Sequence, residues 1–391
     1  MNLQVVVLEL NVVIKLNLNI MLFSFEIMLD QINKLKAYIN NIKEKDKIAI
    51  IYHGFCCDGV CSAVITSRSL ERILKRKVDF HVHNPSHEIT QEIFDFLIKN
   101  KVKKLLFVDM FPYKPVELYE KTEKNCNILI IDHHPYNKDI NSEKTTFIHS
   151  TFINKDIPSH HYPASKLTFD LFSKLINIDD IDYLSCFGLI SDASSKQWKD
   201  FLNETLKKYN FEVNDDIFKT VFGTGSTNIQ LSKRFKDNIE EVFDVIYNSN
   251  KPEDIINSKN LLKYKNKIND EIQYWINKRE KSERHGNLII YKIKSEFSIG
   301  TTVATVLSFD YFPGKTLVVI REDDNDEFFT ISARDQKINI KVNILLEKAA
   351  EGIEDANVGG HEPAAGGRIK KEYYEKFKKN LIEAYKKLSP K

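Results

Sequence analysis

Three short apolar segments, each joined directly to metal-binding residue types, constrain the fold of this chain more than any other feature. Histidine or aspartate ends or follows each of them: KIAIIYH (47–53) leads to His53 and Asp58, KKLLFVDM (103–110) contains Asp109, and NCNILIIDHH (125–134) ends in Asp132, His133 and His134. Helix-like segments alternate with them, which predicts a parallel sheet with helices on both faces. Ligands of such sheets bind beyond the carboxyl ends of the strands. We therefore expect these side chains to converge on one site.

The pattern of the whole chain predicts an α/β fold. A parallel-sheet domain is expected at 47–227, a helical connector at 228–284 and a smaller mixed α/β domain at 285–391. In the last of these, strand-like segments such as KTLVVIRE precede the helical segment INIKVNILLEKAAEGI. Residues 1–46 are an N-terminal extension, and the part before about Met28 is not expected to belong to the fold.

The amino-acid composition indicates the location of the protein in the cell more clearly than its function. The formal net charge of the 391 residues is only +2, so overall charge predicts no particular partner. The apolar N-terminal stretch is broken by polar residues and contains no run of about 18 apolar residues, so no membrane span is expected. The five cysteines are Cys56, Cys57, Cys61, Cys126 and Cys186. Their odd number and lack of a disulfide-framework spacing indicate a reducing, cytoplasmic location.

The mixture of histidine and carboxylate suits divalent transition-metal ions, whereas carboxylates alone suit magnesium or calcium. The side chains expected to hold ions are Asp58, Asp109, His133 and Asp192. Asp109, alone at the end of its predicted strand, is a natural bridge between two ions about 3.5–4 Å apart, which would clamp a phosphoryl group from both sides. The predicted catalytic residues are His134, which would lie nearer to a substrate phosphate, and Asp132, which would orient an imidazole.

A glycine-rich segment near the C-terminus, GGHEPAAGGRI (359–369), predicts a different kind of contact. Glycine lets the backbone approach a ligand closely and present its N–H groups. The residues expected to bind substrate are Arg334, Gly359, Gly360, His361, Gly366 and Gly367, with Arg368 as a further donor. A plain hairpin or a helix cap is the alternative explanation of the glycines. Together with the metal-binding domain, this segment would grip a phosphate across a cleft.

At this point the motifs resemble a known family. IIDHHP, with FVDM before it, LISDAS after it and GGHEPAAGG near the end, is similar to the DHH phosphoesterase superfamily with its DHHA1 C-terminal domain. Within it, the chain looks most like the archaeal RecJ-like proteins, over about residues 47–385. The resemblance implies manganese-dependent cleavage of phosphodiesters, with Mg²⁺, Co²⁺ or Zn²⁺ as alternative ions. It places Asp58, Asp109, Asp132, His133, His134 and Asp192, then Gly359, Gly360 and His361, on the family's motifs.

The first motif departs from the family's pattern. RecJ-like relatives carry acids or histidine at alternating positions, as in HxDxDG, whereas this chain reads YHGFCCDG, with Cys56 and Gly54 at those positions. His53 comes one residue too early. Either the Cys56 thiolate and His53 bind a softer ion such as zinc or iron, or the second ion is lost and hydrolysis is weak or absent. Inert packing of the adjacent cysteines is the simplest alternative.

Three functions follow from the resemblance. The first is RecJ-like hydrolysis of single-stranded DNA or RNA in repair or replication. The second is a degenerate homologue that binds nucleic acid or a replication partner without cutting, since one inactive member of the superfamily is a scaffold in the eukaryotic replicative helicase. The third is cleavage of very short RNAs or cyclic dinucleotides. Phe111, Tyr113, Tyr136 and Tyr162 lie near the motifs and could stack on bases, although such aromatics more often belong to the core.

Overall fold

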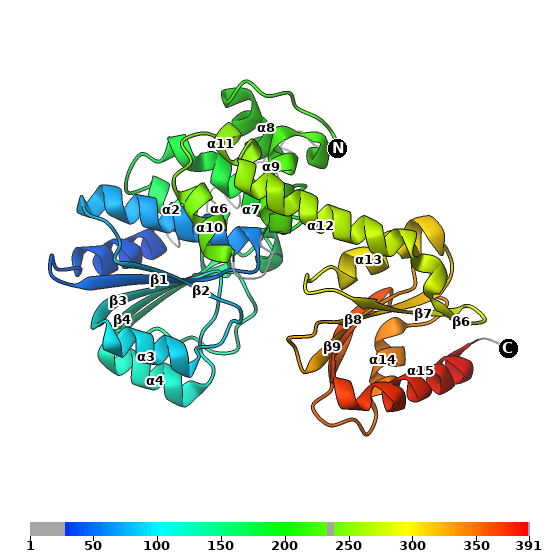
Figure 1. Cartoon of the computed structure of the whole chain (residues 1–391). Coiled ribbons are helices and arrows are strands. Elements are labelled where there is room, and N and C mark those ends of the chain that lie inside the picture. The colour runs from blue at the N-terminus through cyan, green and yellow to red at the C-terminus, as the bar shows by residue number, and fades with distance from the viewer. Residues whose placement is uncertain (1–27, 233–237, 390–391) are drawn as a thin grey trace, which may run out of the picture. The chain divides into compact units, whose positions relative to one another are not determined.

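The computed structural model describes residues 28–232 and 238–389. They form two compact units, unit 1 at 28–232 and 238–262, and unit 2 from residue 263 onward, which divide within helix α12 (Lys259–Asn277). Figure 1 shows the elements of each unit. The extension before Met28, and the prediction made for it, lie outside the described residues, whereas residues 28–40 are helical and bury Leu35 and Tyr38 in the core of unit 1.

Unit 1 is built on a parallel sheet of five strands in the order β2-β1-β3-β4-β5. The strands are β1 (Lys47–His53), β2 (Phe80–Asn84), β3 (Val102–Val108), β4 (Asn127–Asp132) and β5 (Thr145–His149). Every neighbouring pair is parallel. The predicted parallel sheet is therefore confirmed. The three predicted strands are β1, β3 and β4, and the sequence reading had not identified β2 and β5.

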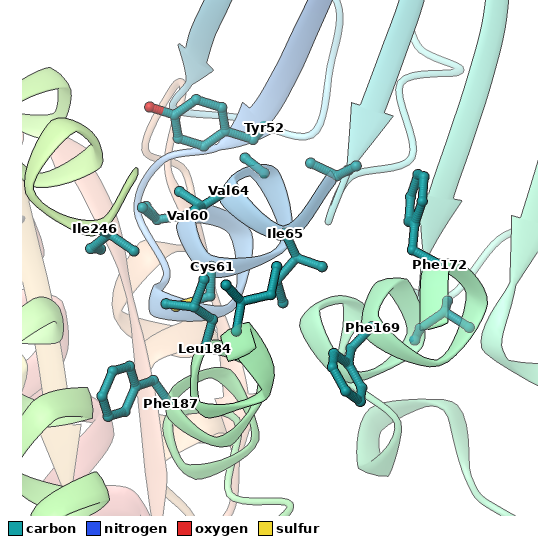
Figure 2. Close-up of a cluster of buried hydrophobic side chains, with 14 of the residues drawn as sticks. Tyr52, Val60, Cys61, Val64, Ile65, Phe169, Phe172, Leu184, Phe187 and Ile246 are labelled. Carbon is teal, nitrogen blue, oxygen red and sulfur yellow. The ribbon is translucent and has the colours of Figure 1, made fainter. Parts of the chain in front are cut away.

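Both faces of this sheet are buried, which explains why its central strands are continuous apolar runs rather than alternating ones. In β1, Ile48, Ile50 and Tyr52 belong to one core cluster, whereas Ala49 and Ile51 belong to the cluster on the opposite face. Helices α2, α6 and α7 cover the first face and α3 and α4 the second (Figure 1). Figure 2 shows the first core, in which side chains of α2 lie between the sheet and helices α6 and α7. The side chains labelled there are those of Tyr52, Val60, Cys61, Val64, Ile65, Phe169, Phe172, Leu184, Phe187 and Ile246.

The numbered helices of unit 1 lie between its strands and after them. They are α2 (Cys57–Leu74), α3 (Gln91–Lys99), α4 (Val116–Asn125), α5 (Ser150–Ile153), α6 (Ala164–Ser173), α7 (Asp182–Ser191), α8 (Lys199–Lys208), α9 (Val221–Ser232), α10 (Ile239–Tyr247) and α11 (Pro252–Ile256), with short 3₁₀ turns η1 (Ser159–His161), η2 (Asp179–Ile181) and η3 (Ile217–Lys219). The stretch expected as a helical connector, 228–284, holds the end of α9 and then α10, α11 and α12.

Unit 2 is a mixed sheet of six strands in the order β10-β11-β9-β8-β7-β6, in which β7 and β8 are parallel and the other pairs antiparallel. Its elements are β6 (Glu283–His285), β7 (Leu288–Lys294), β8 (Thr316–Glu322), β9 (Phe328–Arg334), β10 (Asn357–His361), β11 (Ala364–Lys370), α13 (Gly300–Val306), α14 (Val342–Ala350), α15 (Tyr374–Leu388), the 3₁₀ turns η4 (Arg279–Lys281) and η6 (Lys371–Tyr373), and the π-helical turn η5 (Leu307–Tyr311). The predicted mixed α/β domain is confirmed. The glycine-rich segment itself is a hairpin, β10 to β11, which was the alternative explanation of its glycines.

Candidate metal centre

The predicted metal-binding side chains of unit 1 meet at the carboxyl edge of the parallel sheet. His53 is the last residue of β1, Asp109 follows β3 directly, and Asp132 is the last residue of β4. β2 lies on one side of β1 and β3 on the other, so the chain changes direction across the sheet between β1 and β3. Ligands of open parallel sheets bind at such a switch point. The expected convergence is what the structure contains.

One group of side chains, which we call the Asp58 cluster, consists of Asp58, Asp109, His133 and Asp192. Its centre is His133 Nε2, which lies 3.3 Å from Asp109 Oδ1, 3.5 Å from Asp192 Oδ2 and 3.9 Å from Asp58 Oδ2. The Asp58 side chain is fully buried and that of Asp109 is 1% exposed, whereas that of Asp192 is 22% exposed. The cluster therefore opens to solvent on its Asp192 side.

The acids of this cluster are held by the backbone around them. The Asp58 carboxylate, in the first turn of α2, accepts hydrogen bonds from the N–H groups of Ala164 (2.7 Å) and Ser165 (3.0 Å) at the start of α6. Helix N-termini favour such a negative charge. Gly188 of α7 leaves the room this needs, since a Cβ there would lie 2.4 Å from Asp58 Oδ1 and 2.0 Å from Ser165 Oγ. The sequence reading had given no role to Gly188.

Asp109 has a strained backbone. Its φ is +57°, in the left-handed region that costs most non-glycine residues free energy, and its N–H donates to the Ile131 carbonyl of β4. Strained residues of this kind concentrate at functional sites, where the surrounding structure holds them in place. In this backbone conformation the Asp109 side chain lies in the middle of the cluster, where it faces His133, His134 and His53.

The orientation of His133 is fixed by its second nitrogen. Nδ1 lies 3.1 Å from the Ser159 carbonyl oxygen, which can only accept, so Nδ1 carries the proton and Nε2 points at the acids. Burial lowers the pKa of His133, but Asp109 and Asp58 outweigh it and raise the value to about 10. A cation placed at Nε2 would take the place of the proton that the acids attract there.

The acids themselves carry more negative charge than the imidazoles balance. Burial, together with Asp192 and Asp109, raises the pKa of Asp58 well above its usual range, and burial and Asp109 raise the pKa of Asp192. Burial would also raise the pKa of Asp109, but the neighbouring His133 and His53 hold it below its usual range. Like charges gathered in a buried place are stabilised by a divalent cation.

His134 and Asp132, predicted as catalytic, form a pair. His134 Nδ1 donates to Asp132 Oδ1 over 2.8 Å, which leaves Nε2 available. Burial lowers the pKa of His134, but the hydrogen bond to Asp132 and the charge of Asp132 raise it by more, so the net shift of the pKa is upward. The His134 side chain is 33% exposed, whereas Asp132 is buried. Asp132 therefore orients an imidazole that reaches solvent, which is the arrangement predicted for it.

A second group, which we call the Cys56 cluster, consists of His53, Cys56 and Asp109. Their donor atoms lie within 4.8 Å of one another. Cys56 Sγ lies 2.6 Å from Asp109 Oδ2, and His53 Nδ1 lies 3.7 Å from the same oxygen. The structure thus brings together the two residues that depart from the family's first motif, and Asp109 belongs to both clusters.

Both clusters fit a divalent cation by a direct test. Buried polar atoms almost always have hydrogen-bond partners. Among the described residues, Asp109 Oδ1, His133 Nε2 and His53 Nδ1 are buried and lack one. The first two atoms belong to the Asp58 cluster and the third to the Cys56 cluster, and their donor types are those that bind a divalent transition metal.

Sequence reasoning missed one imidazole beside this centre. The His87 ring, in the loop after β2, lies 4.5 Å from the His53 ring and 4.3 Å from the His134 ring, centroid to centroid. Burial, with the neighbouring His134 and His53, lowers the pKa of His87, and its Nδ1 has no hydrogen-bond partner among the described residues. The signal was present as FHVHNPSH (80–87), an apolar and histidine alternation that ends at the same sheet edge.

The aromatic residues near the motifs belong to the core rather than to an open surface. Tyr162 is 3% exposed and its hydroxyl donates to Asp170, while Phe111, Tyr113 and Tyr136 pack against the second core of unit 1. Phe55, between His53 and Cys56 in sequence, is instead 47% exposed. It is the better candidate for contact with a base.

Unit 2 carries a groove over its glycine-rich hairpin. The groove has a volume of about 620 Å³, and its lining includes Arg334, Arg368, Gly359, Gly360, Gly366 and Gly367 together with Asp326. Arg334 is partly buried, burial lowers its pKa, and no acidic side chain of the described residues pairs with it. β10 is an edge strand, which leaves part of its backbone groups outside the sheet's hydrogen bonds. His361 is exposed at the end of β10 and does not line the groove.

Comparisons with known proteins agree with this architecture. The family model of the DHHA1 domain matches residues 296–387. No curated protein matches the sequence. The fold is similar to that of exonuclease RecJ bound to manganese, at 15% identity and a TM-score of 0.64, with 92% of this chain and 95% of that chain covered.

Two further structures share the fold. RecJ in complex with Mn²⁺ from Thermus thermophilus is 12% identical, with a TM-score of 0.60 and coverage of 91% of this chain and 55% of that chain. CDC45 from Entamoeba histolytica is also 12% identical, with a TM-score of 0.53 and coverage of 92% and 99%. The narrower resemblance to archaeal RecJ-like proteins stays a prediction.

Proposed function

We propose that this chain is a member of the DHH phosphoesterase superfamily and that it hydrolyses phosphodiester bonds of single-stranded nucleic acid with Mn²⁺, as RecJ-like exonucleases do. The DHHA1 match over residues 296–387 and the shared fold support this proposal. The observation that carries the proposal is the Asp58 cluster. Its members come from α2, from the ends of β3 and β4, and from the end of α7, and they meet around unpartnered, buried donor atoms. The manganese-bound RecJ structures that share the fold support the choice of ion.

In this proposal Asp58, Asp109, His133 and Asp192 hold the ion, with Mg²⁺, Co²⁺ and Zn²⁺ as alternatives. A divalent ion there supplies Lewis acidity, which activates water and neutralises charge on a phosphoryl group. The protein holds the metal-binding side chains in place around the ion. Ala164 and Ser165 fix the Asp58 carboxylate, and the Ser159 carbonyl fixes the tautomer of His133. Such supporting contacts typically raise metal affinity by about 10- to 100-fold.

His134 is the proposed proton donor or anion-binding group for the substrate phosphate. Its Nδ1–H is held by Asp132, and the raised pKa keeps the ring protonated further toward neutral pH. Nε2 is then the atom that donates to a phosphate oxygen or to the departing oxygen of the chain. Asp132, which is buried, acts through His134 rather than on the substrate.

Unit 2 is the proposed phosphate-binding part. Arg334, with no acidic partner among the described residues, would bind a phosphate at the glycine-lined groove, and His361 would add a donor at the end of the hairpin. Phe55 in unit 1 would stack on a base, since an exposed aromatic ring is tolerant of base identity. The binding partner is therefore a single strand, with replication or repair proteins as further candidates.

The location is proposed to be cytoplasmic. All five cysteines lie in the described part of the chain and none of them forms a disulfide there, which suits a reducing compartment. Among the described helices, none is both long and apolar enough to span a bilayer.

The test is cleavage of end-labelled single strands by the purified full chain with Mn²⁺, Mg²⁺, Co²⁺ or Zn²⁺ in separate reactions. Stepwise release of mononucleotides with at least one ion is expected. Parallel reactions with DNA, RNA and a dinucleotide separate a long-strand enzyme from one that acts on very short substrates. The Asp109→Ala variant excludes a contaminating nuclease, and the absence of cleavage with every ion would refute the proposal.

One observation favours a second candidate function, a homologue that binds without cutting. Gly54 and Cys56 occupy positions where RecJ-like relatives carry acids or histidine. The fold similarity to CDC45 is compatible with this alternative. It predicts binding of single strands without turnover and at most one ion per chain. Elemental analysis of the purified protein distinguishes the two, since two ions per chain would argue against the scaffold.

A further inference from the structure

The Cys56 cluster differs from the Asp58 cluster in its donor atoms. It offers one sulfur, one imidazole nitrogen and one carboxylate oxygen, from Cys56, His53 and Asp109. Cys56 Sγ donates to Asp109 Oδ2 over 2.6 Å, which is shorter than an ordinary hydrogen bond to or from sulfur. His53 Nδ1 lies 3.7 Å from the same oxygen. All three donors therefore surround one point beside Asp109.

The loop between β1 and α2 is built to keep these donors together. Cys56 is the N-cap of α2, and its sulfur accepts a 3.0 Å hydrogen bond from the Gly59 N–H. A hydrogen-bond donor at a helix N-terminus favours the thiolate, which is the form that binds metals. Gly59 is required for the close approach, since a Cβ there would lie 2.1 Å from the His53 carbonyl oxygen and 2.8 Å from Asp109 Oδ2.

A second observation also indicates a ligand at this point. His53 Nδ1 is buried and has no hydrogen-bond partner among the described residues, although its side chain is 17% exposed as a whole. The carboxylate beside it, that of Asp109, is 1% exposed. The His87 ring packs against the His53 ring and shields it from water. The buried nitrogen thus lies beside the carboxylate rather than in solvent.

We propose that the Cys56 cluster binds a thiophilic divalent ion, Zn²⁺, Co²⁺ or Fe²⁺, in preference to Mn²⁺ or Mg²⁺. The inference rests on the proposed metal-dependent function and adds the identity of the second ion. Thiolate and imidazole select softer ions, whereas the three carboxylates and one imidazole of the Asp58 cluster suit Mn²⁺. Three protein donors also leave one position of a tetrahedral shell open, as in catalytic rather than structural zinc sites. In this proposal, Cys56 in place of the family's acid changes the ion preference of this site without removing the site.

The ligand atoms require only a small adjustment. Donors about 2.0–2.3 Å from a tetrahedral zinc ion lie roughly 3.3–3.8 Å from one another. The 3.7 Å between His53 Nδ1 and Asp109 Oδ2 already falls in this range. The 2.6 Å between Cys56 Sγ and Asp109 Oδ2 would open by about 1 Å when an ion replaces the thiol proton.

The test uses Co²⁺ as an optical probe on the reduced, metal-depleted full chain under anaerobic conditions. A thiolate bound to Co²⁺ gives a near-ultraviolet charge-transfer band, which needs no catalytic activity to be read. The wild type and Cys57→Ser, whose altered thiol lies in the buried pair with Cys61, should show the band. Cys56→Ser should lose it, and His53→Ala should weaken Co²⁺ binding at this site by at least about 10-fold. Cys56→Asp should lose the band and bind a second Mn²⁺ instead.

Each outcome decides the inference. Circular dichroism establishes that the variants fold, and if Cys56→Ser does not, Cys56→Asp and His53→Ala carry the test. A band that survives in a folded Cys56 variant, or is missing from a wild type that binds Mn²⁺, would overturn the thiolate site while leaving the proposed hydrolase intact. A wild type that binds no ion of any kind would overturn both. Zn²⁺ that removes the Co²⁺ band while a large excess of Mn²⁺ leaves it would support the stated preference.

Discussion

The Asp58 cluster and the Cys56 cluster share Asp109 but are held in different ways. In the Asp58 cluster, the Asp58 carboxylate is fixed by backbone N–H groups of α6, and His133 is fixed by the Ser159 carbonyl. In the Cys56 cluster, the two other donors, His53 and Cys56, come from a single turn between β1 and α2. The first site is assembled by the fold as a whole and the second by one short loop.

This difference indicates which part of the metal centre can change most readily. Replacing Asp58 would leave the N–H groups of Ala164 and Ser165 at the start of α6 without their acceptor, which is costly in a buried place. Replacing a donor in the loop changes one side chain at a helix cap, where Cys56 can still accept the Gly59 N–H. The loop is therefore the part of the centre in which the ion preference can drift. The predictions below separate the two clusters, in order of decreasing effect.

Asp109→Ala should disable both clusters at once. It removes the one carboxylate they share, so Mn²⁺ binding and the Co²⁺–thiolate band should both be lost, and activity should fall by more than about 100-fold, the upper cost of losing a mere supporting contact. Mn²⁺ should no longer raise the melting temperature. Asp95→Ala, an exposed acid of α3, is the control. Unchanged metal content and activity in Asp109→Ala would refute the phosphoesterase interpretation itself.

His133→Ala should impair the Asp58 cluster and leave the Cys56 cluster intact. It removes the central nitrogen of the Asp58 cluster, so Mn²⁺ affinity should fall by at least about 10- to 100-fold. His53, Cys56 and Asp109 keep their distances, so the Co²⁺–thiolate band should remain. Isothermal titration with Mn²⁺ and the optical titration with Co²⁺ measure the two sites independently. If both signals disappeared together, the clusters would be one site and the comparison would fail.

Gly188→Ala should damage the Asp58 cluster without touching a ligand. The new Cβ would lie 2.0 Å from Ser165 Oγ and 2.4 Å from Asp58 Oδ1, so α6, α7 or Asp58 must shift. Overpacking of this kind costs about 1–3 kcal/mol of stability, and displacement of Asp58 should lower Mn²⁺ affinity. Denaturant unfolding and Mn²⁺ titration measure the two effects. Ser185→Ala, a small buried change earlier on α7 whose hydroxyl donates to the Asp182 carbonyl, should leave the Mn²⁺ affinity unchanged.

How far the sequence could predict this centre follows from the same comparison. Asp109, Asp132 and His133 could be predicted because each follows a strand that is buried on both faces and therefore reads as a continuous apolar run. β2 and β5 could not, because FHVHN and TTFIH are short and mix apolar with polar residues. With β2 missed, His87 in the loop after it had no expected position. Its contact with His53 and His134 depends on strand order, which spacing along the chain does not contain.

The arrangement of His53 and Cys56 around the loop between β1 and α2 could not be predicted from the sequence for a different reason. Counting back from Asp58 left His53 out of register with the family's pattern, and only the three-dimensional turn shows that Gly59 lets His53 and Cys56 reach the same Asp109 oxygen. Gly188 is a similar case, since its role depends on which side chain from another element lies against it. Close packing between distant segments, rather than local preference, decides such positions.

The smallest expected effects are those of substitutions in unit 2. They test whether the difference between the two clusters concerns the metal centre alone. Arg334→Ala should leave the Mn²⁺ content and the Co²⁺–thiolate band intact, since Arg334 belongs to neither cluster. It removes a cation that has no acidic partner among the described residues, so single-strand binding should weaken by about 10-fold, equivalent to about 1.4 kcal/mol. Arg334→Lys keeps the charge and should lose less. Fluorescence anisotropy with a labelled strand and elemental analysis of each variant provide the two readouts.

His361→Ala should have a smaller effect than Arg334→Ala on the same two readouts. His361 is exposed at the end of β10 and outside the groove, so its loss removes one donor at the margin of the phosphate-binding part. Like Arg334, it belongs to neither cluster, and the metal content should stay unchanged. A loss of metal from His361→Ala as complete as that from Asp109→Ala would mean that the hairpin is part of the metal centre, and the division between ion binding and phosphate binding would be wrong.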